Sequence, residues 1–201
     1  MKVNYQEFWL ILWCWTNQIP VKQSICLTKF SEVSVRHWFE LFRSKLPINQ
    51  EILNNLVQLD EAYFKNRSLL LGKEIGSKKL AFRVLNTTNV QRQHATDFLQ
   101  DYISPETNLN TDGAKIYRNI DQWWPITHHY DIHQKWEFSQ TSEIEGMFGC
   151  LRTFTRRMYH HVSSDKLPSL VSEFCSRFSS PELFINPQSY LEKTLRLVTT
   201  D

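Results

Sequence analysis

Hydrophobic positions in the first fifty residues recur at the three- and four-residue spacing of helices. The predicted helices are residues 6–15, 21–30 and 34–46. In the last of them the predicted inner stripe consists of Val35, Trp38, Phe39 and Phe42. A tight turn before this helix is typical of a helix-turn-helix, which places its last helix, with Arg36 and Arg43 on the outer side, against DNA. Any small three-helix unit has the same pattern, so both interpretations of residues 1–50 stay open.

After "LPINQ" the pattern changes to the alternation of strands. Strands are predicted at 55–64, 68–75, 79–86, 107–113 and 126–132, with a hairpin at Gly76 and Ser77. Helices are predicted at 90–103, 114–124, 142–158, 166–178 and 187–197. The order of three strands followed by alternating helices and strands predicts an α/β ribonuclease-H-like fold, a mixed sheet with helices on both faces, over residues 51–180. Residues 181–201 are then a helical extension.

Three carboxylates converge in such a fold. Asp60 lies on the first predicted strand, and Asp112 follows the fourth at its carboxyl end. These strands are neighbours in the sheet, and Glu145 lies one turn into the long helix after the fifth strand. Carboxylates held together repel one another unless a hard divalent cation such as Mg²⁺ neutralises them. The sequence therefore indicates a metal site for phosphoryl transfer.

Each of these motifs also has an ordinary structural interpretation. Asp60 with Glu61 is compatible with the end of a solvent-facing strand, "TDG" is a common turn, and Ser142 with Glu145 fits a capping box. Glu143 is a rival to Glu145 as third ligand.

The step of seven residues from Glu145 to Arg152 favours the metal site, because it puts both side chains on one helix face. Gly149 lies between them and leaves room for a DNA backbone. An arginine in that position can hold a phosphate beside the metal.

Composition limits the function classes. Hydrophobic residues make up 41% of the 201 residues and charged residues 22%, which indicates a globular protein. The apolar run "FWLILWCW" is too short for the roughly 20 residues of a membrane span, so we predict no membrane association and a cytoplasmic protein. The net charge of +2 does not decide for or against nucleic acid. The four cysteines lack CxxC pairing, and His129 and His133 face one side only in a helix, so no zinc is expected.

At this point the chain resembles a known family. The segments "LDEAYF", "TDGAKIY", "SEIEGMFGCLRTFTRRMYHHVS" and "LVSEFCSRF" are similar, in order and spacing, to those of the DDE transposases of ISXO-like insertion sequences and their Merlin relatives. The resemblance covers residues 4–180. It implies that Asp60, Asp112 and Glu145 are the catalytic and metal-binding triad. It also puts Arg152 where the family usually has lysine and matches Tyr159 and His160 to its Tyr-His pair, so these residues are expected to contact DNA.

The resemblance implies a DNA transposase. Two Mg²⁺ ions, with Mn²⁺ as a substitute, would lie about 4 Å apart and support strand cleavage and strand transfer. Asp60 would bridge the ions, and Asp112 and Glu145 would each hold one. The partners are the element ends and target DNA, bound by a homodimer or larger assembly at the nucleoid. The alternatives are a transposase-derived DNA-binding protein that has lost catalysis and a host nuclease of the same fold.

Overall fold

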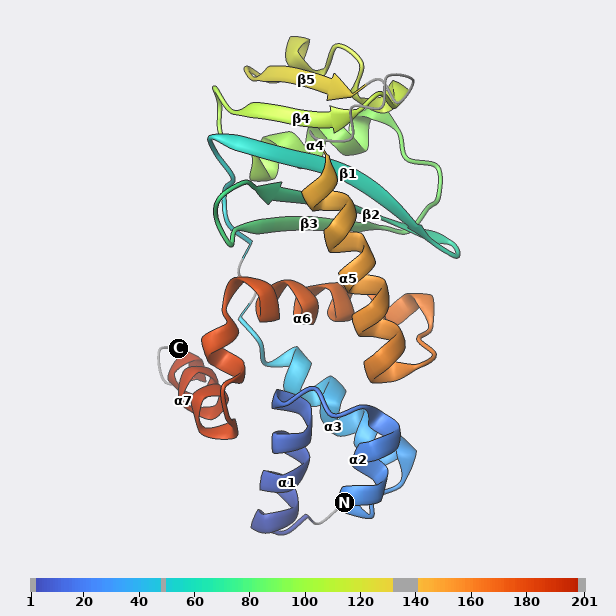
Figure 1. Cartoon of the computed structure of the whole chain (residues 1–201), viewed down its shortest axis with the longest axis vertical. Coiled ribbons are helices and arrows are strands. Elements are labelled where there is room, and N and C mark those ends of the chain that lie inside the picture. Colours follow the sequence, from blue (N-terminus) through green and yellow to red (C-terminus); the bar gives the residue numbers. More distant parts are fainter. Residues whose placement is uncertain (1–2, 48–49, 132–140, 199–201) are drawn as a thin grey trace. The chain divides into compact units, whose positions relative to one another are not determined.

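The chain divides into two compact units. The computed structural model describes residues 3–47, 50–131 and 141–198 (Figure 1). One unit combines Met1–Ile48 with Arg152–Asp201, and the other is Asn49–Leu151. The first boundary falls between Ile48 and Asn49. The second falls inside helix α5 (Ser142–Tyr159), so the C-terminal helices group with the N-terminal ones.

The unit Asn49–Leu151 is built on a five-stranded mixed sheet of order β3-β2-β1-β4-β5. The strands are β1 (Leu56–Phe64), β2 (Arg67–Glu74), β3 (Leu80–Leu85), β4 (Asn108–Asp112) and β5 (Thr127–Asp131). The first three strands pair antiparallel, whereas β4 pairs parallel with both β1 and β5. This topology confirms the predicted ribonuclease-H-like fold.

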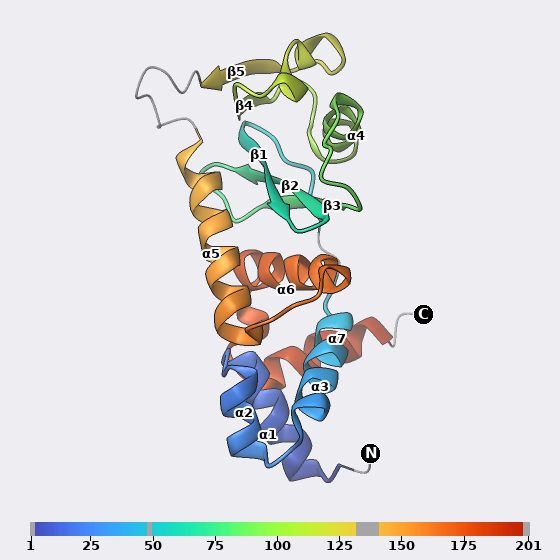
Figure 2. The ribbon, with the colours of Figure 1, turned by 90° about the vertical axis from the view of Figure 1, so that its right-hand side faces the viewer.

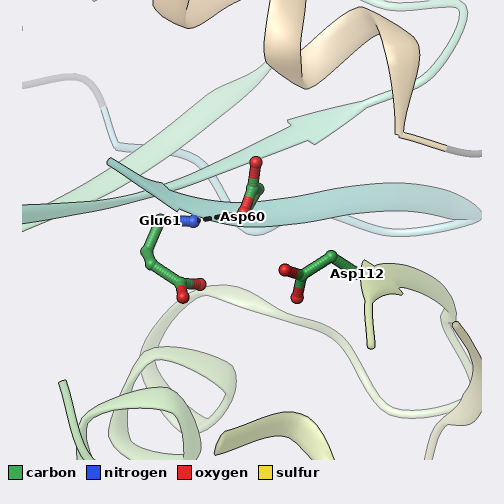
Figure 3. Close-up of side chains that lie close together, drawn as sticks. All are labelled: Asp60, Glu61 and Asp112. Carbon is green, nitrogen blue, oxygen red and sulfur yellow. Dashed lines mark hydrogen bonds between the residues drawn. The ribbon is translucent and has the colours of Figure 1, made fainter. Parts of the chain in front are cut away.

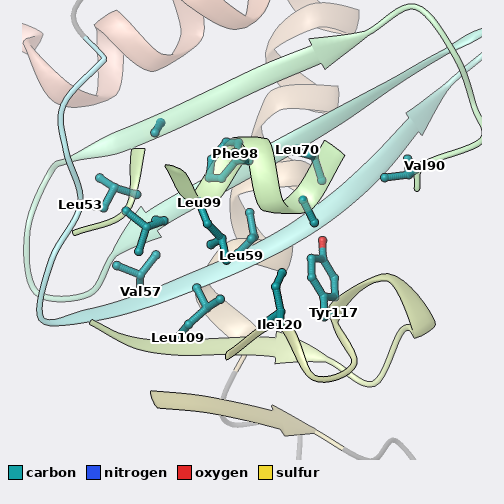
Figure 4. Packing of buried hydrophobic residues seen from close by; sticks show 13 residues of the cluster. Leu53, Val57, Leu59, Leu70, Val90, Phe98, Leu99, Leu109, Tyr117 and Ile120 are labelled. Atoms are coloured by element: carbon teal, nitrogen blue, oxygen red, sulfur yellow. The ribbon is translucent and has the colours of Figure 1, made fainter. Parts of the chain in front are cut away.

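Helices cover both faces of this sheet. Helix α4 (Arg92–Tyr102) packs on one face, and the first turns of α5 lie on the other (Figure 2). The core beneath α4 includes Leu59, Phe98 and Leu99, all fully buried (Figure 4). Gly72 on β2 makes room there, since a Cβ at this position would come within 3.0 Å of the Leu53 side chain and 3.2 Å of the Phe98 ring, and these side chains would have to shift. The Phe98 ring of α4 thus packs closely over β2.

The predicted helix at 114–124 is wrong. The segment instead forms two short 3₁₀ helices, η1 (Lys115–Tyr117) and η2 (Ile120–Gln122). Asn119 between them adopts a left-handed conformation with φ 55°, which interrupts a continuous helix. Tyr117 and Ile120 are nevertheless buried in the core beneath α4, so this segment still contributes to the core.

The other unit is all helical. It contains α1 (Tyr5–Thr16), α2 (Val21–Thr28), α3 (Glu32–Ser44), the last part of α5, α6 (Leu167–Ser179) and α7 (Pro187–Val198). Helix α1 begins with a capping box of Asn4 and Glu7, and Trp15 near its end packs against Phe42 and Tyr190. No described helix has both the length and the apolar character needed to cross a bilayer.

A buried ion network ties these helices together. The Glu173 carboxylate on α6 is fully buried and accepts hydrogen bonds from Arg43 Nε (2.8 Å), the Tyr159 hydroxyl (2.6 Å) and Arg177 Nε (3.0 Å). The sequence put Arg43 on the outer face of its helix, but its side chain is only 5% exposed. Arg43 can be buried because its charge meets an opposite charge inside the unit.

We predict that Glu173→Gln lowers the free energy of unfolding by about 3 kcal/mol or more, because two buried guanidiniums lose their counter-charge. Tyr159→Phe removes one hydrogen bond to the same carboxylate and should cost about 1.5 to 2 kcal/mol. Urea denaturation of both variants beside the wild type measures the two losses. Equal losses, or no loss in Glu173→Gln, would contradict the network.

Candidate active site

Strand register brings Asp60 and Asp112 together. In the parallel pairing of β1 with β4, Val57 lies beside Leu109 and Gln58 beside Asn110. Continued by two residues, this register sets Asp60 opposite Asp112, the last residue of β4. Two of the three predicted ligands therefore meet because their strands are neighbours in the sheet.

A third carboxylate joins them. Asp60, Glu61 and Asp112 each offer a carboxylate oxygen, and these atoms lie within 4.8 Å of one another. Asp60 and Glu61 leave β1 on opposite sides, with Asp112 pointing toward them from the end of β4 (Figure 3). The donor set consists of oxygen atoms only, which suits Mg²⁺ or Mn²⁺ better than softer metals.

Two carboxylates of this cluster, those of Asp60 and Glu61, have raised pKa values. Burial raises the pKa of Asp60 to about 7, and repulsion from Glu61, Asp112 and Glu145 adds to the rise, while the Glu61 backbone N–H opposes it. The pKa of Glu61 is also raised, first by burial, although the Tyr117 hydroxyl bonded to it lowers it. Concentrated negative charge is the electrostatic condition under which a divalent cation binds.

Asp112 has two functions in the structure. Its Oδ1 accepts a hydrogen bond from the Ala114 backbone N–H at 3.0 Å, which closes the turn that "TDG" predicts. The same side chain faces Asp60 and Glu61. The turn and the acidic cluster are therefore compatible interpretations of one motif.

Glu145 lies near this cluster but outside it. It is exposed in the first turns of α5, and the Thr141 hydroxyl donates a long hydrogen bond of 3.5 Å to its Oε1. Its effect on the Asp60 pKa places it within electrostatic reach of Asp60. Helix α5 begins at Ser142, so Thr141, not Ser142, is the residue before its first turn. The rival Glu143 binds Lys73 Nζ at 2.5 Å.

The residues predicted to contact DNA differ in exposure. Arg152 and His160 are exposed, and His160 has a positive φ of 62° directly after α5. Tyr159 and Arg43 are buried in the Glu173 network, which gives both a structural role and argues against a phosphate contact. Arg36 donates to the carbonyl oxygens of Tyr159 (3.0 Å) and His161 (3.5 Å) and thus supports the end of α5.

Comparison with known families identifies the chain. The sequence profile of the ISXO2-like transposase domain matches residues 52–179, which is more than half of the chain. The chain belongs to the ISXO2-like transposase family. The family assignment confirms the resemblance seen in the sequence and makes the protein a transposase-type enzyme that acts on DNA. A comparison with curated proteins gives no match.

Solved structures similar to this ISXO2-like transposase are distant in sequence. One is a chain of the simian T-cell lymphotropic virus intasome in complex with PP2A regulatory subunit B56 gamma, with 14% identity over 84% of this chain and 67% of that one, and a TM-score of 0.48. Another is the catalytic core domain of BIV integrase, with 12% identity over 73% of this chain and 99% of that one, and a TM-score of 0.45.

The sequence reading of the transposase missed Glu61 and Tyr117 as parts of the site. The Tyr117 hydroxyl donates to Glu61 Oε2 at 2.6 Å, and Tyr63 donates to Oε1 at 3.3 Å. The adjacency of Glu61 to Asp60 was the available signal, but alternation along a strand sends neighbours to opposite faces and made Glu61 look unrelated. His133, weighed as a zinc ligand, lies outside the described residues.

We predict that Asp60→Asn stabilises the metal-free protein at pH 8. The pKa of Asp60 in the folded protein, about 7, exceeds its ordinary value, so its protonated form stabilises the fold fully below about pH 4, and that contribution is lost as the pH rises through 7. Asparagine stays neutral and still accepts the hydrogen bond from the Glu61 N–H. Because Asp60 is partly exposed, the variant should raise the free energy of unfolding at pH 8 by only about 1 to 3 kcal/mol. At pH 4.5 it should raise it little.

Thermal unfolding in EDTA at the two pH values measures this difference. The control is Glu51→Gln, which neutralises an exposed carboxylate away from the cluster. An Asp60→Asn variant no more stable than wild type at pH 8 would refute the raised pKa of Asp60.

Proposed function

We propose that this protein is a metal-dependent DNA transposase that cuts a strand at the element end and joins the freed 3′-hydroxyl to target DNA. The observation that carries the proposal is the meeting of Asp60, in the middle of β1, with Asp112, at the carboxyl end of β4, in a member of a transposase family. In an open α/β sheet this edge is where ligands bind.

Asp60, Asp112 and Glu145 would hold the metal, Mg²⁺ with Mn²⁺ as a substitute. When bound, the metal supplies charge neutralisation and activation of the attacking oxygen for phosphoryl transfer. The protein contributes a fixed acidic surface, with Asp60 and Asp112 set by the sheet and Glu145 set by the start of α5. The low exposure of Asp60 makes its charge depend strongly on the cation.

Hydrogen bonding favours Glu145 over the other candidates for the third ligand. Both oxygens of Glu61 accept a tyrosine hydroxyl, from Tyr117 and Tyr63. Glu143 pairs with the buried Lys73. Glu145 accepts a long hydrogen bond of 3.5 Å from Thr141, is exposed, and contributes to the repulsion that raises the pKa of Asp60.

The exposed part of α5 is the proposed path of the DNA backbone. A Cβ added at Gly146 or Gly149 would meet nothing within 4 Å, so packing within the described chain does not require these glycines. Glycine in a helix interior costs about 0.5 to 1 kcal/mol relative to alanine, and close approach of a ligand is one compensating gain. We propose Arg152 and His160 as phosphate contacts. Two element ends must be handled together, which supports a dimer or larger assembly on DNA.

We predict that Asp112→Asn and Glu145→Gln each reduce Mn²⁺-dependent nicking of supercoiled plasmid by more than about 100-fold, beyond the 10- to 100-fold typical of groups that only support a ligand. Glu61→Gln should keep activity within about tenfold of wild type, since the amide oxygen can still accept the buried Tyr117 hydroxyl and the amide NH2 can donate to the Tyr63 hydroxyl oxygen. The assay needs no knowledge of the element ends.

An equal loss of nicking activity in Glu61→Gln and Glu145→Gln would contradict the choice of Glu145 over Glu61 as the third ligand. Wild-type protein that binds plasmid but does not nick it at any metal concentration would contradict the enzyme and favour the DNA-binding alternative. Joining of labelled element ends to a target then separates a transposase from a nuclease.

A further inference from the structure

The first turn of α5 is anchored to the sheet by two side chains from neighbouring strands. The Gln58 amide oxygen on β1 accepts a hydrogen bond from the Ile144 backbone N–H at 2.9 Å, in a buried position. Lys73 on β2 places its Nζ 2.5 Å from the Glu143 carboxylate. Gln58 and Lys73 are direct partners in the β1–β2 register, so both bonds leave the sheet at one point.

These bonds hold the two residues that directly precede Glu145. Ile144 and Glu143 immediately precede Glu145, and Gln58 precedes Asp60 by two residues on β1, which puts both on the same face of the sheet. A shift of this helix turn relative to β1 would therefore change the distance between Glu145 and Asp60.

The two anchors differ from ordinary surface contacts in their burial. Gln58 is 5% exposed and the Lys73 side chain 8%. A polar side chain is buried in a sheet only at a cost that a hydrogen bond or ion pair must offset. Here Gln58 binds the backbone of α5 and Lys73 binds the first acidic residue of that helix. Apolar side chains at these two positions could not make such directional bonds.

We propose that Gln58 and Lys73 are positioning residues that fix the start of α5 so that Glu145 stands beside Asp60 and Asp112. The inference rests on the proposed function, because Glu145 must be a metal ligand for its position to matter. It assigns a specific role to two residues that do not themselves touch the metal.

The experiment combines Mn²⁺ calorimetry with hydrogen exchange on the full-length protein. Gln58→Met keeps the side-chain length but removes the acceptor, so Mn²⁺ binding should weaken about tenfold, as for other groups that orient a ligand. Exchange at the Ile144 amide should become about fivefold faster once its hydrogen bond is lost. Ser68→Ala is the matched control, since Ser68 is a buried β2 residue that bonds the Thr87 carbonyl and should change neither quantity.

A double-mutant cycle separates positioning from general destabilisation. Gln58→Met should weaken Mn²⁺ binding no further once Glu145→Gln is present, because it acts through Glu145. A full additional tenfold loss in the double variant would overturn the inference. A Gln58→Met variant that keeps the wild-type affinity for Mn²⁺ and the wild-type exchange rate at the Ile144 amide would overturn it as well.

Lys73→Met distinguishes the anchor from a competing role for Glu143. If Lys73 positions α5, its removal weakens Mn²⁺ binding in step with faster exchange at Ile144. Tighter Mn²⁺ binding in Lys73→Met would mean that Glu143, released from its partner, is itself a ligand, and would reject the positioning role of Lys73.

Failure of the proposed function would give results different from failure of the positioning role. Wild-type protein that binds no Mn²⁺, with or without DNA, would remove both the metal site and the reason for positioning Glu145. Wild-type protein that binds and cleaves, while Gln58→Met does the same with unchanged exchange, would remove only the inference.

Discussion

Repulsion among carboxylates is the interaction on which the candidate site depends. The parallel pairing of β1 with β4 sets Asp60 opposite Asp112, and Glu61 brings a third acidic group within the same 4.8 Å. Once the sheet has formed, these charges cannot separate, because backbone hydrogen bonds fix the strands that carry them. The fold therefore stores an electrostatic cost that either a proton or a divalent cation relieves.

The two units differ in whether a carboxylate removed from solvent has partners of opposite charge. In the helical unit, Glu173 is surrounded by Arg43, Arg177 and the Tyr159 hydroxyl, so its charge is matched. In the sheet unit, Asp60 is half-buried and faces other carboxylates, and burial together with this repulsion raises its pKa to about 7. Matched charges of the first kind stabilise a fold, whereas unmatched ones of the second kind are typical of a site that binds something.

Sequence patterns predicted the sheet well, because strand alternation and the order of elements depend on local burial. They also predicted that Asp60 and Asp112 lie close together, because the fold makes β1 and β4 neighbours in the sheet. They failed where the outcome depends on distant partners. The outer position of Arg43 on its helix gave no sign of Glu173, 130 residues later. The sequence of residues 114–124 predicted one helix and gave no sign of the left-handed Asn119 that breaks it.

The most direct test of the central claim is diffraction from crystals soaked in Mn²⁺, with anomalous differences collected to locate the metal. The account predicts an anomalous peak within bonding distance of carboxylate oxygens of both Asp60 and Asp112, with Glu145 as a further ligand and Glu61 still bonded to Tyr117. A crystal that binds Mn²⁺ elsewhere, with no peak between Asp60 and Asp112, would contradict it.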